Sequence, residues 1–122
     1  MNQQKICIIG DGLTGLTTAA ILSKQNVSIH LYSGEKKKVK NSDSRTTAIS
    51  ESNFQYIKKN LNLKKNSFFW ACKKVNLFYQ DKEKIINFLN FDEKNKNFMY
   101  IFQNKDLTKK LYKIISKKKN IK

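Results

Sequence analysis

The sequence predicts an α/β fold that begins with a parallel β-α-β unit and continues into antiparallel strands. Three observations support this prediction. An apolar run at residues 6–9 is followed by closely spaced glycines and then by apolar residues at helical spacing. A second apolar run, at residues 27–32, follows that helical segment after a short polar link. From residue 68 to residue 102 the sequence consists of short aromatic and β-branched runs separated by charged turns.

The β-α-β unit is inferred from side-chain periodicity. The run at residues 6–9 is continuous, which is typical of a parallel strand buried on both faces, so Cys7 is expected to be a small core residue. From Leu13 to Lys24 the apolar positions follow helical spacing, with small residues that would let the helix pack closely on a sheet. Residues 27–31 alternate between apolar and polar types, which predicts the second strand.

A second helix is predicted after a polar connector. Ser50 or Ser52 is a candidate N-cap, because a hydroxyl oxygen there can accept an N–H of the first helical turn. Phe54, Ile57 and Leu61 then recur on one face of the helix. The sequence therefore indicates a helix that buries one side against the fold.

The remainder of the chain is predicted to form strands and a final helix. Residues 73–80, 84–91 and 97–103 have the length and composition of antiparallel strands joined by turns. Residues 106–119 place four apolar side chains at helical spacing among lysines, which predicts an amphipathic helix.

The early glycines have the spacing G-x-G-x-x-G between the first predicted strand and the first helix. Gly10 permits the tight turn out of the strand, Gly12 lets a pyrophosphate approach the backbone, and Gly15 lets the helix lie close to the strand. The free N–H groups at the helix start, including that of Leu13, favour phosphate. The motif predicts a Rossmann-like dinucleotide-binding unit.

The position that contacts the ribose is less typical. The motif is usually followed, at the end of the second strand, by an acidic residue that bonds a ribose hydroxyl. Ser33 stands at that place, and Glu35 lies beyond the strand. A neutral hydroxyl makes a weaker bond than a carboxylate, but it bonds the same oxygen. We therefore expect Ser33 to be the ribose contact.

The glycine motif does not by itself distinguish NAD from FAD. The segment DSRTTAIS at residues 43–50 resembles the flavin-dependent aromatic hydroxylases, and more closely the hydroxylases of ubiquinone biosynthesis. In that family the matching arginine contacts FAD. The resemblance therefore implies that Arg45 contacts FAD. The segments at residues 68–80 and 99–111 resemble the entry into the substrate domain and the return to the flavin domain. Asn104 stands where the family has an Asn or Gln near the flavin.

The resemblance implies a fold like that of p-hydroxybenzoate hydroxylase. Residues 1–65 would form the FAD-binding β-α-β unit, residues 66–102 the β-rich start of an incomplete substrate domain, and residues 103–122 a helix that returns to the FAD-binding domain. The implied cofactor is FAD, with NAD(P)H as reductant in full-length members, and the implied substrate is an aromatic or prenylated quinone precursor. The family's second flavin motif, a Gly-Asp pair, has no counterpart here, so we expect an N-terminal portion that is inactive alone. No catalytic side chain is assigned, because the oxidation chemistry belongs to the flavin.

Two other functions remain open. An NAD(P)-binding module would share the glycine motif but would not account for Arg45 and Asn104. A basic protein that binds RNA or an anionic membrane surface would account for the formal charge of +16. The lysines are scattered, however, and arginine, which is favoured for contacts with base edges, occurs once. We therefore predict no nucleic-acid partner.

Metal binding and membrane insertion have little support in the sequence. The two cysteines are far apart and lack the spacing of a metal site. No apolar stretch approaches the ~18–20 residues that span a bilayer, and no signal peptide is recognised. We expect a cytoplasmic protein, with peripheral contact with the inner membrane left open.

Overall fold

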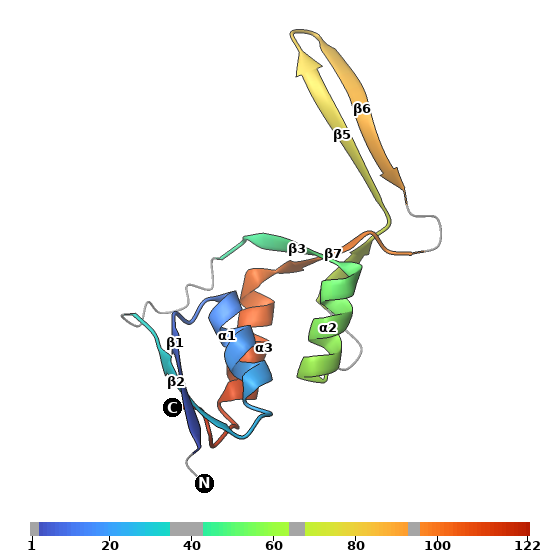
Figure 1. Cartoon of the computed structure of the whole chain (residues 1–122). Helices are drawn as coiled ribbons and strands as arrows, with labels where there is room; N and C mark the ends of the chain where they lie inside the picture. The colour runs from blue at the N-terminus through green and yellow to red at the C-terminus, as the bar shows by residue number, and fades with distance from the viewer. Residues whose placement is uncertain (1–2, 35–42, 64–67, 93–95) are drawn as a thin grey trace.

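The computed structural model describes residues 3–34, 43–63, 68–92 and 96–122. Seven strands and three helices are present in these ranges, and the strands form three small sheets (Figure 1). In chain order the elements are β1 (Gln4–Ile9), α1 (Leu13–Leu22), β2 (Val27–Tyr32), β3 (Thr46–Ser50), α2 (Glu51–Leu61), β4 (Phe69–Cys72), β5 (Lys74–Asp81), β6 (Lys84–Asp92), β7 (Met99–Gln103) and α3 (Asn104–Ile115).

The parallel ladder of β1 and β2 confirms the predicted β-α-β unit. Ile6 lies opposite Ile29, and the pairing continues to the ends of both strands. On its other side Ile29 bridges Ile121 in parallel, and the N–H of Lys122 donates to the carbonyl of Ile29 at 2.9 Å. Residues 120–122 therefore extend this ladder. The predicted final helix is shorter than expected, because α3 ends at Ile115 and the chain turns back to β2.

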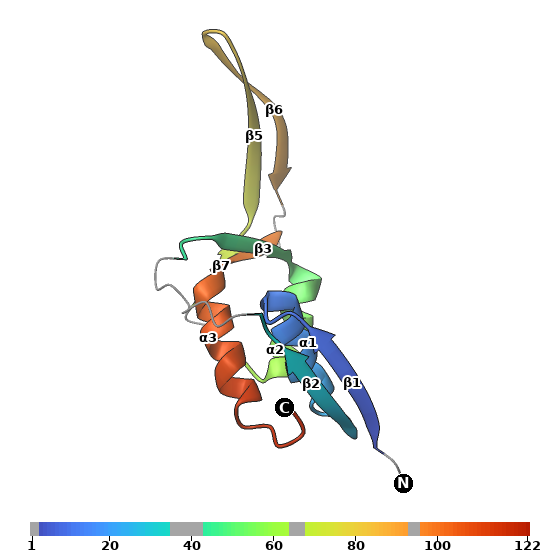
Figure 2. The same cartoon turned by 90° about the vertical axis from the view of Figure 1, so that its left-hand side faces the viewer.

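Only one face of the β1–β2 ladder is covered. α1 and α3 both lie on the same side of it (Figures 1 and 2). Ile6 and Ile8 are half-buried on that side, whereas Cys7 is exposed and Ile9 is 87% exposed. The predictions of a strand buried on both faces and of a core cysteine are therefore wrong. The reason is that no described element packs on the second face.

α1 and α3 pack side by side and form the centre of the core. Leu16 and Leu111 are fully buried between them, and Ala19 and Ala20 of α1 are nearly so. These small side chains let α1 pack closely against α3, whereas the sequence analysis expected them to allow close packing on a sheet. Leu107, Leu111 and Ile115 of α3 are buried as the amphipathic pattern indicated.

A three-stranded antiparallel sheet in the order β3-β7-β4 lies beside the helices. Phe102 of β7 pairs with Thr47 of β3 on one side and with Phe69 of β4 on the other. β3 and β4 were not predicted as separate strands, because each is short and is defined by its pairing with the distant β7. The sheet therefore joins β3, from the region predicted as the FAD-binding unit, to β4 and β7, from the region predicted as the start of the substrate domain.

α2 begins as the sequence predicted. The hydroxyl of Ser50 accepts the N–H of Asn53 at 3.3 Å, which identifies Ser50 as the N-cap. Phe54 and Leu61 are buried, and the Phe54 ring stacks on Tyr100 with 3.7 Å between ring centroids. α2 is therefore held by aromatic contacts with the β3-β7-β4 sheet.

Candidate functional site

The first glycine of the motif forms the turn between β1 and α1. Gly10 has a φ of +105°, in a region that L-residues with side chains rarely adopt. Its N–H donates to the carbonyl of Tyr32 at 2.8 Å, so the turn is fixed to the end of β2. The turn is therefore placed at the carboxyl end of the parallel ladder, where α/β folds bind their ligands.

Gly15 and Gly12 meet different steric requirements. A Cβ on Gly15 would collide with the carbonyl of Gly10 and lie 3.5 Å from a methyl group of Ile8, so close packing of helix and strand requires glycine. A Cβ on Gly12 would meet no atom within 4 Å, and its φ of −70° suits any residue. Folding therefore does not require glycine at position 12. Glycine is also a preferred N-cap residue, and access for a ligand is the additional reason that the motif predicts.

The start of α1 is suited to an anion. Gly12 is the N-cap with extended backbone, and no side chain caps the helix within the described part of the chain. The first turn holds no acidic residue, and the first helical bond runs from the N–H of Leu16 to the carbonyl of Gly12 at 2.9 Å. The N–H groups of Leu13, Thr14 and Gly15 therefore have no intrahelical acceptor, and they carry the positive end of the helix dipole.

Ser33 directly follows β2 and is exposed. The carbonyl of Tyr32, the preceding residue, accepts the N–H of Gly10. The structure thus brings Ser33 to the same end of the ladder as the glycine turn, although the two are separated by a helix in the sequence.

Asp11 is a member of this site that the sequence analysis did not identify. The hydroxyl of Tyr112 on α3 donates to its Oδ2 at 2.7 Å. This hydrogen bond, together with burial, raises the pKa of Tyr112 to about 12. No pattern in the sequence links two positions so far apart, because the contact depends on the packing of α3 against α1.

Arg45 and Asn104 are neighbours in the fold. The N–H of Asn104 donates to the carbonyl of Arg45 at 2.9 Å, where β3 and β7 end their pairing. The hydroxyl of Thr47 donates to Oδ1 of Asn104 at 2.7 Å. These bonds orient the Asn104 side chain at the start of α3 and place it beside the only arginine of the chain.

The Arg45 guanidinium is paired with a carboxylate. Its Nε and Nη2 each donate to an oxygen of Asp43 at 2.9 Å, while the Arg45 side chain is 79% exposed. The two bonds hold the pKa of Asp43 down, at about 2, and raise the pKa of Arg45. A fork of two donors on an exposed arginine matches the oxygens of a phosphate or carboxylate.

The predicted residues therefore form two groups. Gly10, Gly12, Leu13, Gly15 and Ser33 surround the carboxyl end of the parallel ladder. Arg45 and Asn104 lie at the start of β3 and α3. Among the described residues no hydrogen bond joins the two groups directly, but α1 and α3 pack side by side, and both begin at the end that faces β3 (Figure 1).

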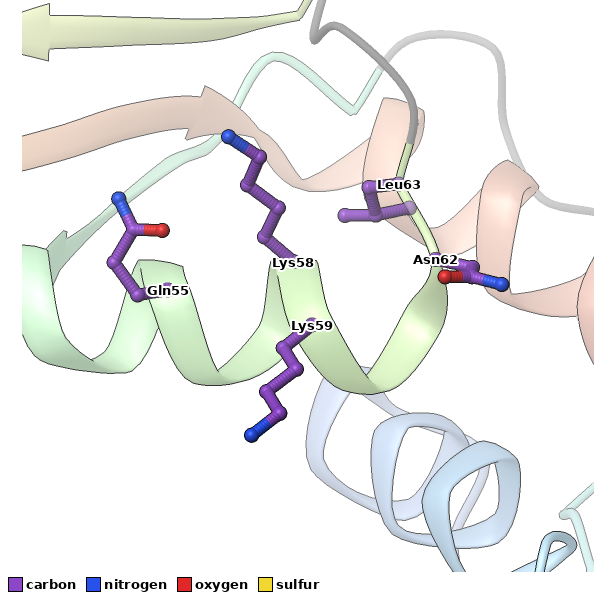
Figure 3. Close-up of a pocket in the computed structure, with 5 residues that line it drawn as sticks. All are labelled: Gln55, Lys58, Lys59, Asn62 and Leu63. Atoms are coloured by element: carbon purple, nitrogen blue, oxygen red, sulfur yellow. The ribbon is translucent and has the colours of Figure 1, made fainter.

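A surface pocket of about 500 Å³ lies on the second half of α2 and is separate from both groups. It is lined by Gln55, Lys58, Lys59, Asn62 and Leu63 (Figure 3). None of the predicted site residues lines it. In the described part of the chain there is no cluster of histidine, cysteine or carboxylate side chains that could hold a metal ion. None of the described helices has the length and apolar character needed to cross a membrane.

The sequence matches no family model and no curated protein. Its fold, however, is similar to solved structures. The p-nitrophenol 4-monooxygenase PnpA from Pseudomonas putida DLL-E4 aligns over 98% of this chain and 31% of its own, with 15% identity and a TM-score of 0.65. FqzB aligns over 99% of this chain and 29% of its own, with 19% identity and a TM-score of 0.67. The 2,6-dihydroxypyridine-3-hydroxylase from Arthrobacter nicotinovorans aligns over 98% of this chain and 29% of its own, with 12% identity and a TM-score of 0.58.

These similarities define the class of fold. The chain spans about three tenths of the length of each matched structure and has the fold of that portion. The expected resemblance to monooxygenases and aromatic hydroxylases is thereby confirmed at the level of the fold. The finer resemblance, to hydroxylases of ubiquinone biosynthesis, remains a prediction.

Proposed function

We propose that the chain is the FAD-binding N-terminal portion of a flavin-dependent monooxygenase that hydroxylates an aromatic ring. The observation that carries the proposal is the glycine turn, open at Gly12, at the carboxyl end of a parallel ladder, in a fold similar to that of monooxygenases. A dinucleotide requires such an opening, because its pyrophosphate must approach the backbone.

The first group of residues would hold the adenosine half of FAD. The pyrophosphate would lie against Gly12 and accept the N–H of Leu13, and Ser33 would bond the ribose. Gly10 and Gly15 shape the turn without contacting the ligand through side chains. The free N–H groups and the helix dipole make the fit to an anion favourable.

Arg45 and Asn104 would contact the cofactor nearer the flavin. Arg45 offers a two-donor fork, whose two N–H groups donate to Asp43 in this structure. Asn104 is oriented by Thr47. FAD, when bound, supplies the oxidation chemistry, with NAD(P)H as reductant in a complete enzyme, while the protein supplies binding and orientation.

The resemblance of the sequence to one group of hydroxylases narrows the proposed substrate class. Residues 43–50 resemble most closely the ubiquinone-biosynthesis hydroxylases, so we propose a ring of an aromatic or prenylated quinone precursor as substrate. In this scheme residues 1–65 and 103–122 belong to the FAD-binding domain and residues 66–102 begin the substrate domain. The protein would act in the cytoplasm, at the inner-membrane surface if its substrate is prenylated.

Amide NMR of the 122-residue chain tests the site. Addition of FAD, or of ADP as its adenosine part, should shift the signals of Gly10, Gly12, Leu13, Gly15 and Ser33. The variant Gly12→Val should keep the folded spectrum and lose these shifts, because a branched side chain fills the open space. Ala71→Val, at an exposed strand position in β4, is the matched control and should bind as the parent does. Shifts confined to other residues, or shifts that persist in Gly12→Val, would refute the proposal.

A further inference from the structure

Asp11 directly precedes Gly12, the N-cap of α1. An aspartate side chain commonly accepts the backbone N–H of the residue two positions further on, which here is Leu13. The N–H of Leu13 is also the group that we propose donates to the pyrophosphate. The Asp11 carboxylate and a bound phosphate are therefore natural competitors for one donor.

Another aspartate of the chain makes this local bond, and Asp11 does not. The N–H of Arg45, two residues after Asp43, donates to Oδ1 of Asp43 at 3.1 Å. At the start of α1, no side chain among the described residues accepts a helical N–H. Oδ2 of Asp11 instead accepts the hydroxyl of Tyr112 at 2.7 Å. The Asp11 side chain is thus held by α3, and the N–H of Leu13 is left for a ligand.

The position of Tyr112 is fixed by the core. Leu111, the preceding residue, is fully buried, and Ile115, one turn further along α3, is buried as well. α3 lies side by side with α1 (Figure 1). Because this packing already fixes the backbone on both sides of Tyr112, the hydrogen bond to Asp11 costs little further conformational entropy.

We propose that Tyr112 is a positioning residue, which keeps the Asp11 carboxylate away from the N–H of Leu13 and so leaves that donor free for the pyrophosphate. The inference rests on the proposed nucleotide site and adds to it a residue outside the glycine motif. Tyr112 acts through Asp11 and does not itself contact the ligand. Loss of its hydroxyl releases the carboxylate, which then accepts the N–H of Leu13 for part of the time and repels a phosphate.

Two variants that lose the same hydrogen bond test the proposal, through ADP titration of the 122-residue chain followed by amide NMR. Tyr112→Phe keeps the carboxylate and should weaken ADP binding by about threefold or more, the effect of one charge placed at a helix N-terminus. Asp11→Ala removes the carboxylate and should bind ADP at least as tightly as the parent. When Tyr112→Phe is added to Asp11→Ala, it should have no further effect. Equal weakening in the two single variants would show that the bond only braces the turn, and would overturn the proposal.

Matched controls make the same chemical changes elsewhere. Tyr56→Phe removes the hydroxyl of an exposed tyrosine of α2. Asp81→Ala removes an exposed carboxylate at the end of β5. Both variants should bind ADP as the parent does. A control that changes the affinity as much as its partner at the glycine turn would contradict the role of Tyr112 and Asp11.

The free chain gives a second measurement that does not depend on ADP. In Tyr112→Phe the amide signal of Leu13 should shift, because its N–H gains the Asp11 carboxylate as acceptor. The same change made in Asp11→Ala should leave that signal in place. A shift of this kind in a chain whose parent binds no ADP would uphold the role of Tyr112 and refute the nucleotide site. A Leu13 signal that does not respond, or ADP binding that is unchanged in Tyr112→Phe, would overturn the inference.

Discussion

The hydroxyl of Tyr112 donates a 2.7 Å hydrogen bond to the carboxylate of Asp11, which lies between the first two glycines of the motif. The bond joins the last turns of α3 to the turn that begins α1. α3 is therefore tied to the glycine turn, although none of its residues belongs to the glycine motif.

Replacement of Tyr112 by Phe should destabilise the chain by about 1 kcal/mol, because an exposed hydrogen bond to a charged group is lost. Urea unfolding near pH 7 measures this change. Tyr56→Phe, at an exposed tyrosine of α2, is the control and should have little effect. An equal loss in both variants would show that the Asp11 contact is not the cause.

The same hydrogen bond should make stability depend on alkaline pH. The pKa of Tyr112 is raised to about 12 in the folded chain, above the ordinary value of 10.0. When folding raises the pKa of a group, the protonated group stabilises the fold at pH values below its pKa in the unfolded chain. The stabilisation by Tyr112 is therefore lost as the pH rises from about 10 through about 12. The difference between the parent and Tyr112→Phe should therefore shrink over this range. A difference that is constant over that range would contradict the assignment.

Gly15→Ala should destabilise the fold far more than Gly12→Ala. The added methyl group of Gly15→Ala must displace the backbone at Gly10, which we expect to cost about 3 kcal/mol or more. The methyl group of Gly12→Ala enters open space at a φ of −70° and should cost no more than about 1 kcal/mol, because alanine is a poorer N-cap than glycine. Thermal and urea unfolding of the two variants give the comparison. Equal destabilisation would contradict the packing described for α1 and β1.

Asp43 should titrate well below the ordinary value of an aspartate. Its pKa is lowered to about 2 by the paired hydrogen bonds from Arg45. Because folding lowers this pKa, the ion pair contributes to the stability of the fold at pH values above 3.8, the ordinary pKa. This contribution is lost as the pH falls through about 2. Carboxyl NMR across this range measures the titration. In Arg45→Ala the pKa of Asp43 should return toward 3.8, and an unchanged titration would show that the pair does not form in solution.

Ser33→Glu should be tolerated and should tighten FAD binding. Ser33 is exposed at the end of β2, and a carboxylate makes a stronger, charge-assisted bond to a ribose hydroxyl than a serine does. FAD titration followed by amide NMR measures the affinity. Gln25→Glu adds the same charge in the loop before β2, at the opposite end of the strand, and serves as the control. Loss of binding in Ser33→Glu alone would remove Ser33 from the ribose position.

Local chemistry made much of this fold predictable. The positive φ of Gly10 and the close packing at Gly15 follow from the turn that joins a strand to a helix at this spacing. The N-cap at Ser50 is likewise a local feature. Each depends on neighbours within a few residues, so the sequence pattern carries the information.

Features that depend on distant packing could not be predicted in the same way. Cys7 looked like a core residue because its neighbours are apolar, but its exposure depends on which face α1 and α3 cover. β3 was missed because Thr47 gains its strand pairing from Phe102. The contact of Tyr112 with Asp11 joins two ends of the sequence, and neither residue has a local pattern that signals it.

The isolated 122-residue chain should bind FAD weakly and should hydroxylate nothing. It spans about three tenths of the length of the matched structures, so we propose that the remaining contacts with the cofactor and the substrate lie outside it. Each missing charge-assisted bond is worth roughly 1–3 kcal/mol, so the loss of several weakens affinity by orders of magnitude. Flavin fluorescence during titration with FAD should show no tight stoichiometric complex, and NADPH absorbance should not fall when aromatic substrates are added. Tight flavin binding would show that these residues suffice to hold the cofactor, and NADPH consumption that depends on substrate would show that they suffice for catalysis.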